Sequence, residues 1–365
     1  MSPVAVAVPV DPVPAAPTKA AQPAAPAPAP SARLLAYAHF DSTPAVGTEF
    51  PASTHTSSPV LSIRDILADD AKIAALATLI AERGVVFFRN AIISPEEQTA
   101  LIDALGVAGV RPADAGLHIH PCTLESGKDG DHISRVSNQF VYNEKLKTSL
   151  NSSLLTREAG KERWHTDVSF EPVPASYACL QIRDLPPTGG DTLWASAYEA
   201  YDRLSLPVQS LLEGLTAVHE GTLFLDVNKE NGGQTTFRTN RGHPLNSNQD
   251  LRAVHPVIRT HPVTGWKGLF VNKMFTRRIN EVTKEESDVL LAFLFEHIHG
   301  NHDLQVRFRW EPNSLAIWDN RATLHAATLD VDGATNREGT RAVSVGDVPF
   351  FDPASKSRRA ALGLL

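Results

Sequence analysis

Residues Leu304–Trp310 have the sequence LQVRFRW, in which apolar and polar side chains alternate at every position. Successive side chains of a β-strand point to opposite faces. The four apolar residues of this stretch would therefore share one face, and the glutamine and two arginines would share the other. The alternation predicts a strand with one buried face.

Further short apolar runs follow residue 165, and Gly, Pro and Asn residues bound them, as is typical of strands. These runs are Tyr177–Ile182, Asp191–Ala195, His255–Thr260, Leu269–Asn272 and Leu315–Trp318. Helices are predicted between them, at Tyr198–Leu204, Val208–Leu215 and Thr283–His299. Many short strands with helical decoration favour a mainly β fold with a jelly-roll or barrel core over a doubly wound sheet.

The part of the chain before these strands is predicted to contain two helices and one strand. Apolar residues recur at helical spacing from residue 61 to 79, and Gly84 ends the run. Val85–Phe88 then predicts a buried strand. Ser94-Pro95-Glu96-Glu97 is a capping box with proline at the first helical position, and it opens a helix that continues through Leu105. A second capping box, from Thr283 to Glu286, opens the later helix.

The two ends of the chain differ from its middle. Residues 1–34 are dominated by Ala, Pro and Val and contain no aromatic residue. Such a segment cannot bury enough apolar surface to offset the entropy of ordering, so it predicts a disordered tail. We expect a single domain over residues 35–355, which is long enough to bury a sizeable core, and a short C-terminal tail over residues 356–365.

The composition excludes several classes of function. The formal net charge is −7 and no Lys/Arg-rich block occurs, so the charge expected of a nucleic-acid-binding protein is missing. No run of 18 apolar residues and no secretory signal pattern is present. Two cysteines, Cys122 and Cys179, give little scope for disulfides. We expect a soluble, cytoplasmic protein without a nucleic-acid or membrane partner, and homo-oligomerisation stays open.

The segment Trp164-His165-Thr166-Asp167 carries the first candidate site. On a strand, residues two apart project from the same face, so His165 and Asp167 could offer an imidazole nitrogen and a carboxylate oxygen to one ion. A His-x-Asp pair by itself is more often a surface pair than a metal site, so a third ligand is needed. His325 is the candidate, because it follows the predicted strand Leu315–Trp318.

Two histidines and one carboxylate predict a particular kind of metal centre. Bound on one face of an iron ion, they leave coordination positions open for a chelating co-substrate and O₂. A structural zinc site would instead have four protein ligands, usually with cysteine. Asp319-Asn320-Arg321 is predicted to be a turn that aims His325, with Asp319 as the orienting residue. His255 and His261, each followed by proline, are interpreted as structural.

Two arginines follow the third candidate ligand. A co-substrate such as 2-oxoglutarate chelates iron through its 1-carboxylate and keto oxygen, so its distal carboxylate needs another partner. A guanidinium group suits a carboxylate by its charge and by its planar fork of donors. Arg337 and Arg341 lie 12 and 16 residues after His325, on either side of a turn-like Glu338-Gly339 pair. Each could also be an ordinary solvated side chain.

The chain also contains a series of characteristic sequence words in a fixed order. They are Leu117–Pro121 (LHIHP), Trp164–Phe170 (WHTDVSF), Gly189–Trp194 (GGDTLW), His255–Pro262 (HPVIRTHP), Phe270–Asn272 (FVN), Phe275-Thr276, and Ile317–Arg321 (IWDNR) with His325. With these words the stretch from about Leu61 to Phe351 resembles the taurine dioxygenase family of Fe(II)/2-oxoglutarate oxygenases. That family includes alkylsulfatase-type and fungal sulfonate dioxygenases.

The resemblance implies a double-stranded β-helix core, which is a clavaminate synthase-like jelly roll. It implies Fe(II) bound by His165, Asp167 and His325, with O₂ and with 2-oxoglutarate as co-substrate. The residues that it assigns to 2-oxoglutarate are Thr192 and Arg337, which would share the distal carboxylate. Those that it assigns to a small anionic organic substrate are His120, Arg341, the backbone at Val168, and Phe275 as an aromatic wall. No catalytic side chain beyond the metal ligands is expected.

The implied reaction is hydroxylation of the carbon next to a sulfonate or sulfate ester, which releases sulfite or sulfate plus an aldehyde, with succinate and CO₂. The chain has Thr123 and Lys161 where taurine-specific members place a tyrosine and an asparagine. A lysine would repel the amine of taurine, which favours another anion. Two alternatives stay open. One is the same chemistry on a carboxylate such as an aryloxyacetate, and the other is a non-catalytic metal-binding barrel.

Overall fold

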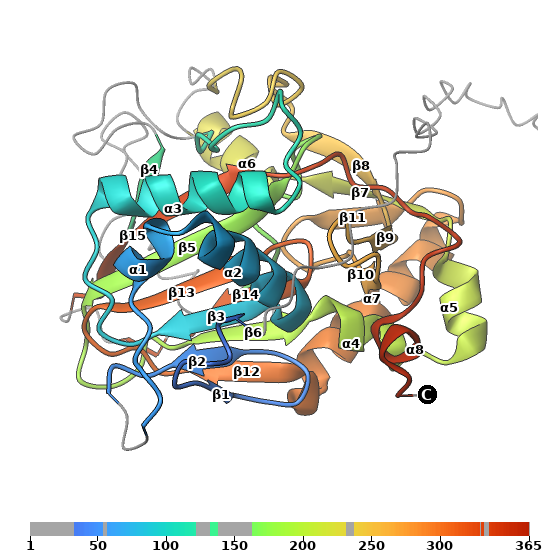
Figure 1. Ribbon diagram of the computed structural model, residues 1–365. Helices are drawn as coiled ribbons and strands as arrows, with labels where there is room; N and C mark the ends of the chain where they lie inside the picture. The colour runs from blue at the N-terminus through green and yellow to red at the C-terminus, as the bar shows by residue number, and fades with distance from the viewer. Residues whose placement is uncertain are drawn as a thin grey trace, which may run out of the picture.

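Seven strands form the largest β-sheet of the protein, shown in the computed structural model in Figure 1. The structure describes residues 33–53, 57–121, 132–137, 163–230, 237–328, 330–331 and 336–364. Across the sheet the order is β1 (Phe40–Asp41), β2 (Thr48–Phe50), β3 (Val85–Phe88), β13 (Ser314–Asp319), β5 (Ala175–Asp184), β15 (Glu338–Val345) and β4 (Ile133–Ser137). Neighbouring strands are antiparallel except β2 and β3, which are parallel.

Smaller sheets complete the described β-structure. One contains β12 (Gln305–Phe308), β6 (Thr192–Ser196) and β14 (Thr323–Ala327), in that order. Another contains β11 (Thr276–Ile279), β7 (Thr216–Glu220) and β8 (Arg252–Pro256). A two-stranded sheet pairs β9 (Ile258–Thr260) with β10 (Lys267–Leu269).

Aromatic side chains fill the space between the large sheet and the β12-β6-β14 sheet. Phe87 of β3 stacks on Phe308 of β12, with ring centroids 4.1 Å apart. Trp194 of β6 packs against Trp318 of β13, with ring centroids 5.8 Å apart, and all four side chains are buried. Burial of these large rings stabilises the two sheets face to face. Two facing, mostly antiparallel sheets make a jelly-roll core, so the predicted mainly β, jelly-roll fold class is confirmed.

Local sequence patterns appear in the structure as predicted. The four apolar residues of Leu304–Trp310 are buried, whereas Arg307 and Arg309 are exposed. Both capping boxes are present: Ser94 opens α3 (Pro95–Ala108) and Thr283 opens α7 (Lys284–Gly300). These predictions are confirmed, and each depends only on residues that are close together in the sequence.

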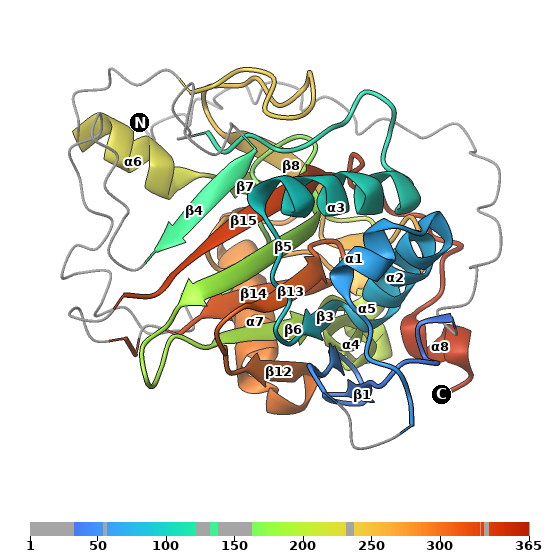
Figure 2. The same ribbon diagram turned by 60° about the vertical axis from the view of Figure 1, so that its left-hand side comes forward.

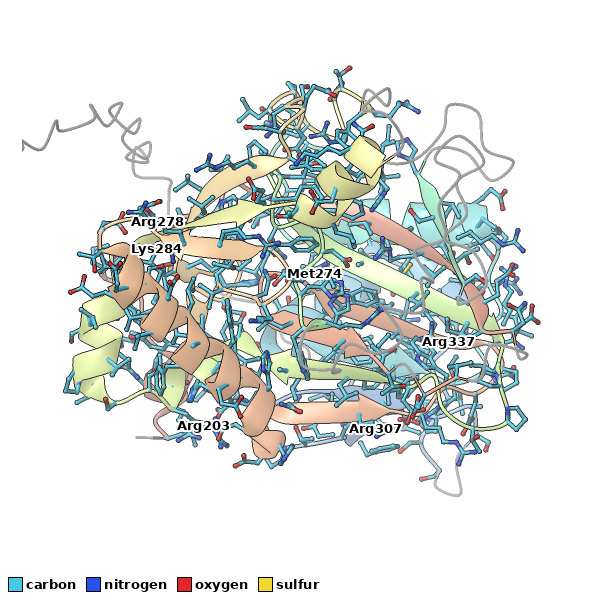
Figure 3. All side chains as sticks on the ribbon, turned by 180° about the vertical axis from the view of Figure 1, so that it is seen from behind. Arg203, Met274, Arg278, Lys284, Arg307 and Arg337 are labelled. Atoms are coloured by element: carbon cyan, nitrogen blue, oxygen red, sulfur yellow. The ribbon has the colours of Figure 1, made fainter. Side chains whose placement is uncertain are left out.

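Helices cover the outside of the sheets. The first three, α1 (Ile63–Leu67), α2 (Asp70–Arg83) and α3, lie over one face of the large sheet (Figures 1 and 2). Their apolar side chains share a core cluster with Tyr177 of β5 and Ile317 of β13. The long helix α7, which begins at Lys284, lies on the opposite side of the molecule (Figure 3). Three shorter helices follow β6 and β7, namely α4 (Ala197–Asp202), α5 (Leu206–Leu212) and α6 (Thr222–Glu230).

Two predicted strands differ from those observed. The predicted strand His255–Thr260 is divided between β8 and β9. Of the predicted strand Leu269–Asn272, only Leu269 lies in a strand. The side chain of Asn272 instead accepts a hydrogen bond from the backbone N–H of Phe275 at 2.8 Å, which holds this segment in a turn.

The ends of the described chain are packed against the fold. Leu34, inside the predicted tail of residues 1–34, is fully buried in the core, and residues 1–32 lie outside the described residues. The predicted C-terminal tail of residues 356–365 contains helix α8 (Arg358–Leu362). Arg358 and Arg359 make ion pairs with Glu199 of α4, which explains why this end is ordered.

Within the described part of the chain, none of the helices combines the length and the apolarity that crossing a membrane requires. Cys122, Thr123 and Lys161, which entered the sequence-based expectations, lie outside the described residues.

Candidate functional site

His165, Asp167 and His325 converge in the structure. One ligand atom from each residue lies within 4.8 Å of the others. Nε2 of each histidine is 3.9 Å from Oδ1 of Asp167. Asp167 and His325 are buried, and His165 is half-buried. The three donor atoms are therefore close enough together to contact one metal ion.

The backbone joins the two histidines through a short bridge. The N–H of His165 donates to the carbonyl oxygen of His325 at 3.0 Å, and the N–H of His325 donates back at 2.8 Å. The predicted strand around His165 and Asp167 is wrong beyond this bridge, because residues 167–170 form a turn. Val168 in that turn has a φ of 47°, a left-handed conformation that is unfavourable for a β-branched residue. The turn, rather than strand periodicity, places Asp167 beside the imidazole rings.

Hydrogen bonding fixes which nitrogen of His165 is free for a metal. Its Nδ1 lies 2.8 Å from the backbone oxygen of Arg163. A carbonyl oxygen only accepts, so Nδ1 carries the hydrogen and Nε2 keeps its lone pair. Burial lowers the pKa of His165, and it lowers the pKa of His325 to about 3, with the neighbouring His165 as the next cause. Neutral imidazole is the form that binds metal ions.

Asp167 supplies negative charge to the centre. Its Oδ1 accepts a hydrogen bond from Nη1 of Arg341 at 2.7 Å, whereas its Oδ2 is buried without a hydrogen-bond partner in the described structure. Burial by itself would raise the pKa of Asp167, but the surrounding positive charge, that of Arg341 first, outweighs burial and holds this pKa below its usual range. A buried carboxylate oxygen without a partner is costly unless a cation binds it. The donor set therefore fits a divalent metal, and two histidines with one carboxylate are typical of Fe(II).

Thr192 and Arg337, predicted to bind the co-substrate, are brought into contact. Oγ1 of Thr192 accepts hydrogen bonds from Nη2 of Arg337 at 3.3 Å and from the indole N–H of Trp310 at 3.0 Å. All three side chains are buried. A hydroxyl oxygen that accepts two hydrogen bonds still has its own hydrogen to donate. The hydroxyl and the guanidinium together suit a carboxylate.

A glycine allows Arg337 to approach the start of β6. Nε of Arg337 donates to the backbone oxygen of Gly190 at 2.7 Å. Gly190 has a φ of 73°, and a Cβ atom there would lie 2.8 Å from Cδ of Arg337, so only glycine fits without displacing the arginine. Burial lowers the pKa of Arg337 to about 10, which leaves it charged at pH 7. Arg337 lies toward one edge of the molecule in Figure 3, whereas Met274 lies near its middle.

Arg337 immediately precedes β15 and Arg341 lies within it, so a strand rather than a turn separates the two arginines. The predicted turn at Glu338-Gly339 is wrong, because these residues begin β15, which pairs with β5 on one side and β4 on the other. Four residues of extended chain span about 13 Å between Cα atoms. Arg337 therefore reaches Thr192 while Arg341 reaches Asp167. Nε of Arg341 is buried without a hydrogen-bond partner in the described structure.

The other residues predicted to contact substrate lie around Arg341 and Asp167. Burial lowers the pKa of His120 to about 3, with the charge of Arg341 as the next cause, so its imidazole is neutral at pH 7. Phe275 is buried and packs edge-on against His165, with ring centroids 6.0 Å apart. Val168 is the turn residue next to Asp167.

Sequence reasoning missed three side chains at the site. The indole of Trp310 holds Thr192, and Oδ1 of Asn320 accepts the backbone N–H of Asp167 at 3.0 Å. The ring of Phe224 lies 5.2 Å from the ring of His120, measured between centroids. No local spacing marks these residues, because each contacts a partner that is distant in the sequence.

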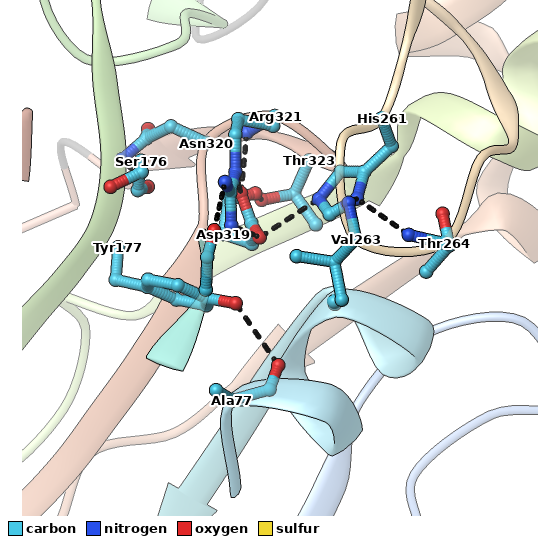
Figure 4. Close-up of polar contacts among 12 residues, drawn as sticks. Ala77, Ser176, Tyr177, His261, Val263, Thr264, Asp319, Asn320, Arg321 and Thr323 are labelled. Atoms are coloured by element: carbon cyan, nitrogen blue, oxygen red, sulfur yellow. Dashed lines mark hydrogen bonds and ion pairs between the residues drawn. The ribbon is translucent and has the colours of Figure 1, made fainter. Parts of the chain in front are cut away.

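Asp319 does not orient His325 as predicted. Figure 4 shows its carboxylate between His261 and Arg321. It accepts hydrogen bonds from Nε2 of His261 at 3.0 Å and from Nη2 of Arg321 at 2.7 Å. Burial would raise the pKa of Asp319, but Arg321 and His261 outweigh it and hold this pKa below its usual range. The network fixes the turn between β13 and β14, and Nδ1 of His325 has no hydrogen-bond partner among the described residues.

Comparisons with known proteins identify similar chains. The family model described as taurine catabolism dioxygenase TauD, TfdA family matches residues 40–343. The alpha-ketoglutarate-dependent dioxygenase btcD of Neocamarosporium betae is 41% identical over an alignment of 344 residues, which covers 91% of this chain and 97% of that protein. The alpha-ketoglutarate-dependent sulfonate dioxygenase of Saccharomyces cerevisiae is 32% identical over 286 residues, 78% of this chain and 63% of that protein. The crystal structure of a taurine dioxygenase from Burkholderia xenovorans aligns with a TM-score of 0.64 at 26% identity, covering 88% of this chain and 94% of that one.

Proposed function

Because this chain belongs to the TauD, TfdA family of taurine catabolism dioxygenases, we propose that it hydroxylates the carbon next to a sulfonate or sulfate ester group. The chain is a 2-oxoglutarate-dependent dioxygenase, and it uses Fe(II), 2-oxoglutarate and O₂. The observation that carries the proposed substrate class is the position of Arg341. Its guanidinium contacts Asp167 at the candidate metal centre and retains a buried Nε without a hydrogen-bond partner in the described structure.

The proposed ligands of Fe(II) are His165, Asp167 and His325. Bound Fe(II), with 2-oxoglutarate and O₂, supplies the oxidising power for hydroxylation while 2-oxoglutarate is converted to succinate and CO₂. The chain contributes the three donor side chains that would hold the metal. It also contributes apolar rings, which limit the access of water to the metal site. Trp318 packs beside His325, with ring centroids 5.0 Å apart, and Phe275 packs beside His165.

Thr192 and Arg337 are the proposed partners of the distal carboxylate of 2-oxoglutarate. Arg337 is charged at pH 7 in spite of its burial, and the hydroxyl of Thr192 has a hydrogen to donate. Trp310 and Gly190 hold these two side chains in place. Donors of fixed direction orient the co-substrate before reaction, which is how positioning lowers a barrier.

Arg341 and His120 are the proposed partners of the substrate's anionic group. Arg341 brings the positive charge, whereas the neutral imidazole of His120 can donate a hydrogen bond without adding charge. Phe275 and the backbone at Val168 would border the carbon skeleton of the substrate, because apolar and aromatic surface typically lines such pockets. The description of the Saccharomyces cerevisiae relative as a sulfonate dioxygenase supports a sulfur anion.

The proposed products follow from simple bond chemistry. Hydroxylation of R–CH₂–SO₃⁻ gives R–CH(OH)–SO₃⁻, whose C–S bond breaks with the electron pair on sulfur. Sulfite leaves, the hydroxyl group loses its proton, and the aldehyde R–CHO forms. A sulfate ester, R–CH₂–O–SO₃⁻, gives the same aldehyde and sulfate through cleavage of a C–O bond. Neither collapse requires a side-chain general base.

Oxygen uptake that depends on 2-oxoglutarate tests this proposal. The purified enzyme is given a panel of sulfonates, sulfate esters and carboxylates, and O₂, succinate, sulfite and sulfate are measured. We expect at least one sulfur anion to stimulate uptake, with sulfite or sulfate released in equal amount to succinate. Arg341→Met should remove this stimulation while the anaerobic Fe(II)/2-oxoglutarate charge-transfer band persists. Stimulation by carboxylates such as aryloxyacetates alone would overturn the sulfur-anion proposal and favour the carboxylate alternative.

A further inference from the structure

A buried asparagine, Asn320, lies behind the candidate metal centre, in the turn between β13 and β14. Only 1% of the residue is exposed. Its Oδ1 accepts hydrogen bonds from the backbone N–H of Asp167 at 3.0 Å and from the indole N–H of Trp318 at 3.2 Å. Its Nδ2 donates to the backbone oxygen of Ser176 at 3.2 Å. Both polar atoms of the amide therefore have partners.

These partners allow only one orientation of the amide. The N–H groups of Asp167 and Trp318 can only donate, so they must face the oxygen, and the carbonyl of Ser176 can only accept. The backbone N–H of Asn320 also donates to the oxygen of Ser176, at 2.9 Å. Figure 4 shows Asn320 and Ser176 next to each other. Asn320 is thus fixed to β5 by two hydrogen bonds to one carbonyl oxygen, and it presents its side-chain oxygen to Asp167.

Asn320 connects the segments that carry the proposed iron ligands. It bonds directly to the backbone of Asp167, and His325 follows it by five residues in β14. The turn that begins at Asp167 contains the left-handed Val168, a conformation that persists only when surrounding structure holds it. We propose that Asn320 is a positioning residue of the metal centre, which fixes Asp167 relative to the two histidines. This inference rests on the proposed function, in which those residues bind Fe(II).

Metal affinity of the Asn320→Ala variant, measured without turnover, tests the inference. Fe(II) is titrated anaerobically with 2-oxoglutarate present and followed by the charge-transfer band, and Mn(II) binding is followed by electron paramagnetic resonance. Loss of a residue that orients a metal ligand typically weakens metal binding about 10- to 100-fold, so we expect both Kd values to rise by at least about tenfold. Asn320→Ser, which removes less volume, is measured alongside and should change both Kd values in the same direction.

Asn246 provides a matched control. It is fully buried, its Oδ1 accepts the N–H of Val173 at 2.9 Å, and its Nδ2 donates to the oxygen of Val173 at 2.8 Å. Asn246→Ala therefore removes two buried side-chain hydrogen bonds, compared with three in Asn320→Ala, but from a residue that does not hold a proposed ligand. We expect it to lower the thermal midpoint as Asn320→Ala does, while both metal Kd values stay within about twofold of the parent.

The outcomes separate this inference from the proposed function. A parent protein that binds neither metal in the presence of 2-oxoglutarate overturns the proposed function. A parent that binds both metals, with Kd values for Asn320→Ala and Asn320→Ser within about twofold of it, overturns only the positioning role. Equal weakening in Asn320→Ala and Asn246→Ala assigns the effect to general destabilisation and overturns the positioning role as well.

Discussion

The proposed binding of 2-oxoglutarate depends on a single hydroxyl group, that of Thr192. Its oxygen accepts hydrogen bonds from Arg337 and Trp310, so its hydrogen is left for the co-substrate. Thr192→Val keeps the shape of the side chain but removes the hydroxyl, and two buried donors lose their acceptor. We expect affinity for 2-oxoglutarate to fall about 10- to 100-fold, the size expected for hydrogen bonds to a charged group. Anaerobic titration of 2-oxoglutarate into the Fe(II) protein measures this change.

Thr264→Val is the control for that substitution. Oγ1 of Thr264 accepts the N–H of Trp266 at 3.2 Å and lies 3.3 Å from the hydroxyl of Tyr198, in a turn after β9. Its loss should leave 2-oxoglutarate affinity at the parent value. Unchanged affinity in Thr192→Val, or an equal decrease in both variants, would argue against a direct contact between Thr192 and the co-substrate.

At the scale of single residues, the sequence located candidates whose type and order form recognisable words. The proposed ligands were found in this way, and the two arginines were found by their spacing after His325. In the structure, the three ligands lie together, Arg337 contacts Thr192 and Arg341 contacts Asp167. Asn320 and Trp310 were not assigned, although both lie in stretches that were singled out. Their partners, Asp167 and Thr192, are 153 and 118 residues away in the sequence. A hydrogen bond over such a separation leaves no periodicity that could be detected.

At the scale of structural elements, the turn before β6 allows a specific prediction. Gly190 and Gly265 have similar left-handed conformations, with φ values of 73° and 70°. An alanine at either position would cost about 1 kcal/mol or more because of its backbone conformation. A Cβ atom at Gly190 would also lie 2.8 Å from Cδ of Arg337, whereas nothing lies within 4 Å of one at Gly265.

We therefore expect Gly190→Ala and Gly265→Ala to differ in ligand binding more than in backbone strain. Gly190→Ala should displace Arg337 and weaken 2-oxoglutarate binding by about tenfold or more, because a charge-assisted contact is misplaced. Gly265→Ala should bind 2-oxoglutarate like the parent. Urea unfolding and the anaerobic 2-oxoglutarate titration are measured on both variants. Equal affinities in the two would show that Arg337 tolerates the added methyl group.

The turn between β13 and β14 is held by the carboxylate of Asp319, which can accept hydrogen bonds but cannot donate them. Oδ1 of Asp319 accepts from the backbone N–H and Nε of Arg321, and Oδ2 accepts from Nη2 of Arg321 and Nε2 of His261. Asp319→Asn would turn an amide NH₂ group toward two donors and remove the nearest counter-charge of buried Arg321, leaving Asp347 at 3.9 Å (Figure 4). Breaking such a buried pair should lower the free energy of unfolding by about 3–5 kcal/mol, as measured by urea denaturation.

Asp288→Asn serves as the comparison for Asp319→Asn. Asp288 pairs with Lys284 one turn away on α7, and both side chains are more than half exposed. An exposed pair of this kind contributes little to stability, so the urea midpoint of the Asp288→Asn variant should match that of the parent. A similar midpoint for both variants would show that the Asp319 network is not needed to hold the turn.

Elements defined by local signals were predicted better than those defined by their neighbours. The capping boxes of α3 and α7 and the alternation around β12 act within a few residues, and each was predicted from the sequence. β15 was interpreted as containing a turn because it begins with Glu338-Gly339. Pairing with β5 and β4 on its two sides overrides that local preference.

At the scale of the whole molecule, the order of the strands could not be predicted from the residues alone. In the large sheet, β13 pairs with both β3 and β5, so that Ala316 faces Phe87 on one side and Leu180 on the other. Nothing in a strand's own pattern says which distant strand it will join, because alternation only specifies a buried face. A mainly β fold with a jelly-roll or barrel core followed from the number and spacing of strands, and the choice of a double-stranded β-helix followed from the family resemblance.

Buried neutral histidines should make the stability of the whole fold depend on pH. Burial, with Arg259 as the next cause, lowers the pKa of His255 to about 3, and its Nε2 lies near the carbonyl oxygens of Ser169 and Glu171. In the unfolded chain this histidine has a pKa of about 6.5, so between pH 6.5 and 3 the unfolded state binds a proton that the folded state does not. Its contribution to stability is therefore present above pH 6.5 and is lost as the pH falls. One such histidine costs about 2 kcal/mol at pH 5.

The His255→Gln variant removes this titrating group and leaves the other buried histidines in place. Its amide can still donate to the two carbonyl oxygens but does not titrate, so the variant should be less stable than the parent at pH 7. Between pH 7 and 5, however, it should lose about 2 kcal/mol less of its free energy of unfolding than the parent does. Urea denaturation of the metal-free proteins at both pH values measures the two losses. Equal losses would mean that His255 is already protonated in the folded state near pH 6, and that its burial against two carbonyl oxygens does not hold it neutral.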